Sequence, residues 1–222
     1  MESMPAARGY FEFVTYGDAA YAIAGYYGSG EFQRVDRWST ETGWVQMANY
    51  PIPNHRFCAV ADEGNDRIYG LGGVTTSYNY KAYYYTPTTN SWTSMPNLYY
   101  SSYDSGCAII TMKGGGSRWI VLAGTHSTRM QYYDLAGTKW RAMTSATTSI
   151  NRISLVSITQ YEAYQVGGYS SKHGSSRRNW WIWNGNKQRF ADPTLYMRRE
   201  HVGGDFTRIP EDALILRKCS LL

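Results

Sequence analysis

The sequence is short of the residues on which many catalytic and metal-binding sites depend. Only four histidines occur among 222 residues, and none has a neighbour at a metal-ligand spacing. The three cysteines are widely spaced and odd in number, which argues against a disulfide scaffold and against a zinc site. We therefore expect no catalytic activity, no metal and no cofactor.

Long apolar runs and helical patterns are missing too. The first ten residues include Glu2 and Arg8 and contain no continuous apolar stretch, so they predict neither a signal peptide nor a membrane anchor. No stretch has the apolar spacing of a long amphipathic helix. Together with unpaired cysteines, these absences lead us to expect a cytoplasmic protein in a reducing compartment.

Aromatic residues and glycine are abundant instead. Aromatic residues make up 16% of the chain, with 21 tyrosines, and there are 22 glycines. Tyr and Trp suit pleated, half-buried surfaces, while Gly supplies turns between short strands. A chain of this length can bury the core of one domain. The composition therefore predicts a single all-β domain.

An aromatic pattern recurs four times along the chain. Each instance has an aromatic residue, a turn, a second aromatic residue and then Met or Pro three positions later. The instances are Trp38–Trp44–Met47, Tyr85–Trp92–Met95, Tyr133–Trp140–Met143 and Trp183–Phe190–Pro193. The two aromatic residues are six positions apart in the first instance and seven in the others. Such regular spacing indicates a structural repeat.

A doublet of small residues precedes each aromatic instance, at the end of a β-rich run. The doublets are Ala24-Gly25, Gly72-Gly73, Ala123-Gly124 and Gly167-Gly168. They recur every 44 to 51 residues, close to the period of about 50 residues typical of one class of propeller repeat. Small residues let inner strands crowd together, while bulky rings fill a wedge that widens outward.

On these residues the chain resembles the kelch-repeat family, whose signature is a diglycine after an inner strand followed by a spaced Tyr and Trp. The resemblance implies an all-β, kelch-type β-propeller of four repeats plus a partial fifth, forming a small or an incomplete ring. Within one domain spanning 1–222, the approximate repeats are 4–50, 51–95, 96–143 and 144–193, with a partial repeat at 194–216. The innermost strands are predicted at 9–14, 57–61, 107–111 and 153–158.

Cys58 and Cys107 fall at matching positions of two predicted inner strands. Unpaired cysteines are among the most buried residues in proteins. We therefore expect both to be free thiols in the core.

The repeat phase also predicts a binding face. In kelch proteins, the loops after the diglycine and the loops between repeats lie on the same face, where family members bind peptides. The residues that match this face are Tyr26 and Tyr169 after the doublets, and Arg8, Arg56, Arg152 and Arg199 before the inner strands. Val74, Thr125 and Ser102 stand at the corresponding positions of other repeats, so we expect a lopsided site.

Positive charge gathers toward the end of the chain. Residues 167–222 contain ten Lys or Arg and five Asp or Glu, and Arg177 and Arg178 belong to this group. Arginine binds carboxylates through two parallel hydrogen bonds. The predicted function is therefore protein interaction, in which loop-face Arg and Tyr bind an acidic segment of a partner. A glycan-binding propeller is one alternative, since Tyr and Trp stack on sugars, and a solvated basic edge without a partner is another.

Other classes of partner have weaker support. Trp180 and Trp181 lie beside two arginines, but no nucleic-acid-binding module is recognisable, so nucleic acid is not an expected partner. A membrane is not expected either unless Cys219, in a carboxyl-terminal Cys-Ser-Leu-Leu box, is prenylated. An incomplete ring would expose strand edges through which copies of the chain could associate.

Overall fold

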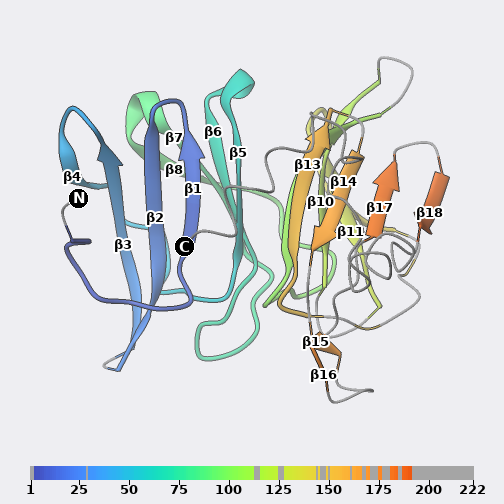
Figure 1. The fold of residues 1–222 in the computed structure, drawn as a ribbon, viewed down its shortest axis with the longest axis horizontal. Helices are drawn as coiled ribbons and strands as arrows, with labels where there is room; N and C mark the ends of the chain where they lie inside the picture. Colours follow the sequence, from blue (N-terminus) through green and yellow to red (C-terminus); the bar gives the residue numbers. More distant parts are fainter. Residues whose placement is uncertain are drawn as a thin grey trace, which may run out of the picture.

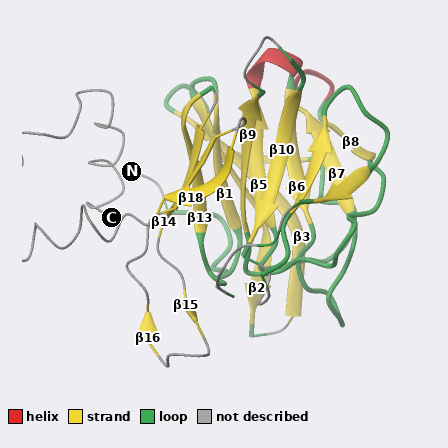
Figure 2. Cartoon of the chain, turned by 90° about the vertical axis from the view of Figure 1, so that its right-hand side faces the viewer, coloured by secondary structure: helices red, strands yellow, loops and turns green. Residues whose placement is uncertain are grey.

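A computed structural model describes residues 3–28, 30–112, 116–124, 128–143, 145, 149, 151–160 and 162–166, followed by the backbone of four short strands up to residue 191. The regular secondary structure of the described residues is almost entirely β-strand (Figure 2). Their helical elements are two 3-10 turns, η1 (Glu63–Asn65) and η2 (Pro87–Thr89). The all-β prediction is confirmed. No helix in the described ranges is long and apolar enough to cross a membrane.

The strands form four-stranded antiparallel sheets in chain order (Figure 1). The first sheet contains β1 (Glu12–Tyr16), β2 (Ala19–Tyr27), β3 (Gly30–Ser39) and β4 (Gly43–Met47). The second contains β5 (Cys58–Asp62), β6 (Arg67–Leu71), β7 (Ala82–Thr86) and β8 (Ser91–Ser94). The third contains β9 (Gly106–Thr111), β10 (Arg118–Ala123), β11 (Gln131–Asp134) and β12 (Trp140–Ala142).

The fourth sheet follows the same order with one insertion. It contains β13 (Ser154–Thr159), β14 (Glu162–Val166), β17 (Trp181–Asn184) and β18 (Lys187–Ala191). A separate hairpin of β15 (Tyr169–Ser170) and β16 (Ser175–Ser176) lies between β14 and β17 in the sequence. Each sheet is thus a meander that falls within one of the four predicted repeats.

Consecutive sheets pack against one another. Their first strands are neighbours, with β1 beside β5, β5 beside β9 and β9 beside β13. Three apolar clusters fill the spaces between the first and second, second and third, and third and fourth sheets. Sheets stacked face to face through such layers, with first strands side by side, are consistent with a β-propeller-like fold.

The aromatic pairs of the repeat lie directly opposite each other on the two outer strands. Trp38 pairs with Trp44, Tyr85 with Trp92 and Tyr133 with Trp140. Trp92 packs on the core between the first and second sheets, and Trp140 lies in the core between the second and third. The side chains of Trp183 and Phe190 are outside the described residues. Two tryptophans therefore occupy equivalent slots against the preceding sheet.

The small doublets contact the segment that leads into the next sheet. The amide of Gly73 donates to the carbonyl of Ser102 at 2.6 Å, and that of Gly25 to the carbonyl of Asn54 at 2.8 Å. A Cβ on Gly72, whose φ is 69°, would lie 2.3 Å from the Ser102 carbonyl oxygen. Glycine is required here because both the backbone angle and the contact exclude a side chain. The fourth doublet is outside the described residues.

Cys58 and Cys107 are not free thiols, which corrects the expectation that both are unpaired. Cys58 and Cys107 form a disulfide across neighbouring first strands, with Cα atoms 6.0 Å apart, a usual separation for such a bond. In the register, Cys58 lies opposite Leu71 and Cys107 opposite Leu122, each the residue before a doublet. The matching positions were therefore read correctly, but adjacent strands bring the two sulfur atoms together.

Candidate functional site

A non-glycine residue with positive φ precedes the first strand of every sheet. The four are Tyr10, Arg56, Asp104 and Arg152, with φ between 49° and 54°. Few non-glycine residues adopt this left-handed conformation, and it costs free energy. We refer to these four as the rim residues, because they occupy one repeat-equivalent position at the same end of neighbouring sheets.

Backbone hydrogen bonds join the rim residues in series. The amide of Arg56 donates to the carbonyl of Tyr10 at 3.0 Å, and the amide of Asp104 donates to the carbonyl of Arg56 at 2.9 Å. The amide of Arg152 continues the series to the carbonyl of Asp104 at 2.6 Å. The left-handed turn thus directs each amide to the preceding rim residue, which links the four backbone segments in series.

The rim side chains surround a small cavity, the rim pocket, of about 250 Å³. Its other lining residues are Phe11, Glu12, Phe57, Ser105 and Ile153. Arg56 Nη1 and Arg152 Nε both lie 3.6 Å from Oδ2 of Asp104. The guanidinium of Arg56 also lies over the ring of Tyr10, 4.7 Å from its centroid. One carboxylate therefore stands between two cations at the mouth of the pocket.

Arg8 is not part of this site, contrary to the sequence prediction. It precedes Tyr10 by two residues, as Asn54 precedes Arg56, and it is only 7% exposed. Its guanidinium donates to Asp36 at 2.6 Å and to the carbonyls of Ala22 and Arg34. Burial lowers the pKa of Arg8, and Asp36 opposes that shift. Arg8 is thus a structural residue between strands.

Two positions assigned from the sequence shift accordingly. Tyr10 stands where an arginine was expected in the first repeat, and Asp104 stands at the rim in the third. Ser102, which the sequence placed near the rim, is fully buried at the position equivalent to Asn54. Arg56 and Arg152 do line one pocket, as the repeat phase predicted.

Tyr26 lies beside the pocket. Its backbone pairs with Gly9, just as Val74 pairs with His55 in the next repeat, so the equivalence of Tyr26 and Val74 is confirmed. The rings of Tyr26 and Tyr10 lie 5.2 and 6.3 Å from that of His55, which precedes Arg56. Arg177, Arg178, Arg199 and the side chain of Tyr169 lie outside the described residues.

Exposed tyrosines gather on the same face. The six in the described residues are Tyr10, Tyr26, Tyr27, Tyr78, Tyr80 and Tyr99, with exposed fractions from 38% to 59%. All lie before a first strand, at the end of a second strand, or in a segment that follows a second or fourth strand. Because antiparallel strands alternate in direction, these segments lie at the same end of the strands. We name this end of the sheets the tyrosine face.

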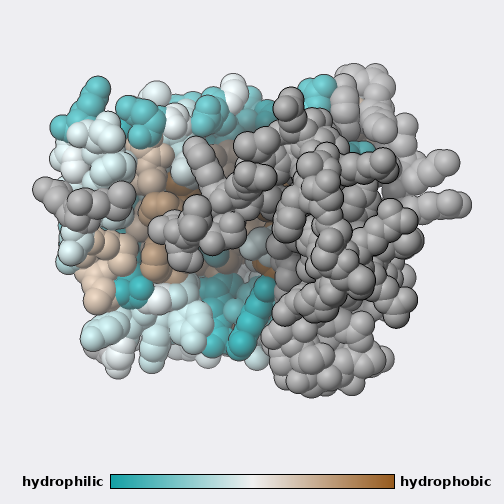
Figure 3. All heavy atoms as spheres, in the orientation of Figure 1, coloured by the Kyte–Doolittle hydropathy of each residue, from teal (hydrophilic) through white to brown (hydrophobic). Residues whose placement is uncertain are grey.

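Sequence reasoning singled out only Tyr26 from this group. A signal for the others was present, since Tyr78, Tyr80 and Tyr99 lie outside the β-rich runs. Two further rings support the face: Tyr103 stacks on Tyr78 at 4.0 Å, and Arg129 lies 4.9 Å over the ring of Tyr100. In Figure 3, hydrophilic residues line both ends of the described sheets, and apolar residues lie between them.

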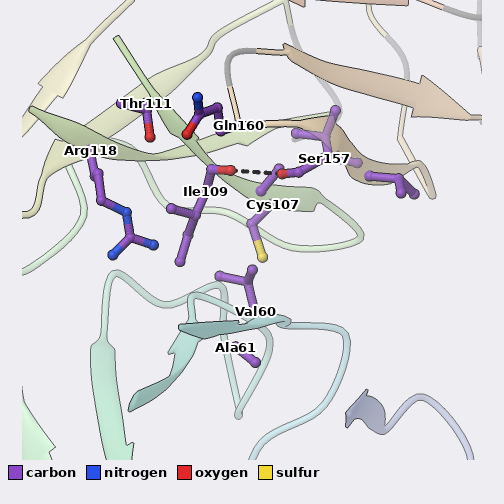
Figure 4. Close-up of a pocket in the computed structure, with 11 residues that line it drawn as sticks. Val60, Ala61, Cys107, Ile109, Thr111, Arg118, Ser157 and Gln160 are labelled. Atoms are coloured by element: carbon purple, nitrogen blue, oxygen red, sulfur yellow. Dashed lines mark hydrogen bonds between the residues drawn. The ribbon is translucent and has the colours of Figure 1, made fainter. Parts of the chain in front are cut away.

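A second cavity, of about 520 Å³, lies along the first strands β5, β9 and β13 (Figure 4). Its lining includes Val60, Cys107 and Ile109, and the hydroxyl of Ser157 donates to the carbonyl of Ile109 at 2.7 Å. Among its described lining residues the charged one is Arg118, which forms a two-bond pair with Asp62 at 2.8 and 3.1 Å. The cation is therefore compensated, and this cavity is the weaker candidate for an acidic ligand.

No group of three or more His, Cys, Asp or Glu side chains in the described part of the chain could hold a metal ion. His55 has its pKa lowered by burial first and by the nearby charge of Arg56 second. An imidazole of this kind stays neutral at physiological pH.

Comparison with known proteins gives a likeness of fold. No protein-family model and no curated protein matches the sequence. Among solved structures, that of YjhT aligns with a TM-score of 0.67 at 11% sequence identity, covering 86% of this chain and 67% of the other. At such low identity the likeness extends to the fold alone.

Proposed function

We propose that the chain is a kelch-type β-propeller module whose tyrosine face binds an acidic segment of a protein partner, without catalysis. The repeat assignment is supported by the aromatic pairs on the outer strands and by the doublets that receive the following segment. The assignment of function rests on the rim pocket.

One observation carries the proposal: two arginines share one carboxylate at a distance longer than a hydrogen bond. Arg56 and Arg152 each lie 3.6 Å from Asp104, whereas N–H···O hydrogen bonds span about 2.7–3.2 Å. Nε of Arg56 is buried and has no hydrogen-bond partner among the described residues. A ligand carboxylate beside the two guanidinium groups would accept hydrogen bonds from their exposed N–H groups and balance the excess positive charge.

The tyrosines fit the same role. A tyrosine offers a large, rigid contact area with few rotatable bonds and a hydroxyl that can form a hydrogen bond. Tyr, Trp and Arg are also the residues that dominate the energetics of many protein interfaces. Two charged anchors beside a band of exposed rings therefore suit an extended acidic peptide.

The test is a binding measurement with matched peptides. Fluorescence anisotropy would compare a labelled peptide rich in Asp and Glu with its Asn and Gln counterpart. Arg56→Ala should weaken binding of the acidic peptide by about 10- to 100-fold, because charge-assisted hydrogen bonds are worth about 1.5–3 kcal/mol. Arg141→Ala, which removes an exposed arginine on β12, is the control and should leave affinity unchanged. Equal affinity for both peptides would contradict the proposal.

Glycan binding is the second candidate, favoured by the stacked pair of Tyr78 and Tyr103 and by the exposed rings around it. Salt separates the two functions. Binding through Arg56 and Arg152 should weaken by several fold between about 50 and 500 mM NaCl, because salt screens exposed charges. Stacking of sugars on tyrosine rings should respond little.

The compartment belongs to the same proposal. A cytoplasmic location was expected partly from free thiols, and the disulfide removes that ground and favours an oxidising compartment. Lysing cells under denaturing conditions in the presence of a thiol-alkylating reagent, followed by mass spectrometry, would decide. A cytoplasmic protein should carry the label on Cys58 and Cys107, and a protein from an oxidising compartment should not.

A further inference from the structure

The rim pocket holds one ionisable group that the proposed function does not use. Glu12 is the first residue of β1 and lines the pocket, one layer deeper along the strand than Tyr10. It lies opposite Ile23, the residue before the first doublet. Its repeat equivalents are therefore Cys58 and Cys107, which occupy the same register in the next two sheets.

The disulfide indicates which way this layer faces. Because Cys58 and Cys107 meet between neighbouring first strands, side chains in their register lie between strands, and Glu12 itself is partly exposed where it lines the pocket. With both sulfur atoms joined, Glu12 is the ionisable member of the three equivalents. Burial raises the pKa of Glu12 to about 8, and a backbone hydrogen bond from Ala59 only partly opposes that shift.

We propose that Glu12 is a specificity-determining residue of the rim pocket: its neutral form admits an acidic ligand group, and its ionised form excludes one. The inference rests on the proposed function, since it concerns the same pocket. An ionised Glu12 carboxyl in the pocket that Arg56 and Arg152 also line would lower the positive potential that attracts a ligand carboxylate, whereas the protonated form leaves it intact. By linkage, a bound acidic ligand also holds the proton on Glu12.

The charged and titratable groups around Glu12 allow a clean test. Tyr10 lies on the same segment, and His55 and Arg56 lead into β5. Asp104 and Arg152 lead into the other two first strands. The arginines keep their charge throughout the accessible range of pH. His55 has a lowered pKa, so it stays neutral above pH 6.5. Between pH 6.5 and 9.0, Glu12 is therefore the group whose charge we expect to change.

The experiment measures the affinity of the labelled acidic peptide between pH 6.5 and 9.0. For the wild type, affinity should fall by about tenfold over this range, since one unfavourable charge appears. Glu12→Gln should keep the affinity of the wild type at pH 6.5 across the whole range. A wild-type affinity that does not change with pH, or an equal fall in both proteins, would overturn the inference.

A second measurement needs no variant. Calorimetric titrations at pH 8 in two buffers with different ionisation enthalpies report the protons taken up on binding. The inference requires uptake of about half a proton, because half of the Glu12 carboxyls are ionised there before the ligand binds. Zero uptake would contradict it. Failure of the wild type to bind the peptide at any pH would instead refute the proposed function.

Discussion

The two ends of the sheets use charge differently. At the end opposite the tyrosine face, ionic and polar groups of neighbouring sheets are paired at hydrogen-bonding distance, although Arg37 and Asp18 of the first sheet lie 3.8 Å apart. Asp62 accepts two bonds from Arg118, the hydroxyl of Tyr16 donates to Asp66 at 2.8 Å, and the amide of Gly17 donates to Glu63 at 2.8 Å. On the tyrosine face, Arg56 and Arg152 both lie 3.6 Å from one carboxylate oxygen of Asp104, which is longer than a hydrogen bond. The first end joins neighbouring sheets, and the second is the end at which we propose that another molecule binds.

At the first end, both carboxylate oxygen atoms of Asp66 accept hydrogen bonds. The hydroxyl of Thr88 donates a short hydrogen bond to it and, with the bond from Tyr16, lowers the pKa of Asp66. Tyr16 has its pKa raised to about 12, mainly by its bond to the ionised Asp66. These groups join the first sheet to the second, so their polar atoms are committed within the chain. The predictions below test this division, from the largest effect to the smallest.

The largest effect should come from the disulfide, which joins β5 and β9 near the tyrosine face. Replacing Cys58 and Cys107 together by Ala should lower the free energy of unfolding by about 3–4 kcal/mol, because a bond closing 49 residues restricts the unfolded chain. Urea unfolding monitored by tryptophan fluorescence would measure it. Wild type treated with a reductant should match the variant. If reduction leaves the unfolding midpoint unchanged, the bond does not form in the folded protein.

Breaking a pair at the structural end should cost stability and spare binding. Asp62 is buried, and Asp62→Ala leaves Arg118 without its partner, so the free energy of unfolding should fall by about 1–3 kcal/mol. The affinity for the acidic peptide should stay within twofold of wild type. Arg56→Ala is the matched counterpart, which should weaken binding and leave the free energy of unfolding nearly unchanged. If Asp62→Ala were fully folded and still bound the peptide more weakly than wild type, the two ends would not differ in the way proposed.

Glu12 should make stability depend on pH. Its carboxyl has a higher pKa folded than unfolded, about 8 against 4.5, so the folded chain holds its proton longer. The free energy of unfolding therefore decreases as pH rises from about 4.5 to 8. Glu12→Gln should be more stable than wild type at pH 8, by up to about 1.4 kcal/mol for each pH unit above 4.5. At pH 4 the two should be equal. A stability difference that does not change with pH would contradict a raised pKa.

The smallest effect should come from Asp104. Asp104→Asn removes the negative charge between Arg56 and Arg152, so the acidic peptide should bind about three- to tenfold more tightly. Stability should change by under about 1 kcal/mol, because both pairs are long and Arg152 is largely exposed. The anisotropy assay at low salt would measure the gain, and 500 mM NaCl should reduce it. Weaker binding in this variant would mean that Asp104 itself contacts the ligand.

Much of the architecture was predictable because the repeat has a local signal. Tryptophan at a fixed distance after another aromatic residue placed the outer strands, and the register sets those residues opposite each other. The doublets placed the second strands for the same reason, since the close approach of Ser102 to Gly72 tolerates no side chain. Local sequence thus encodes each sheet.

The site was less predictable because it depends on contacts between repeats. Aligning on arginine selected Arg8, whereas aligning on the apolar residue before the first strand, Phe11 and Phe57, would have selected Tyr10. The disulfide joins residues 49 positions apart, and only the packing of adjacent strands brings them together. The raised pKa of Glu12 follows from burial between strands, which no pattern within one repeat contains.

The serial backbone bonds at the rim separate scaffold from specificity. Each amide donates to the preceding carbonyl whatever side chain the residue has. The side chains at the four positions can therefore be substituted without removing these backbone hydrogen bonds. The left-handed backbone limits the choice of residue, because it disfavours β-branched residues and favours Asn, Asp and Gly. Libraries at Tyr10, Arg56, Asp104 and Arg152 would therefore offer a compact route to new binding preferences on an unchanged frame.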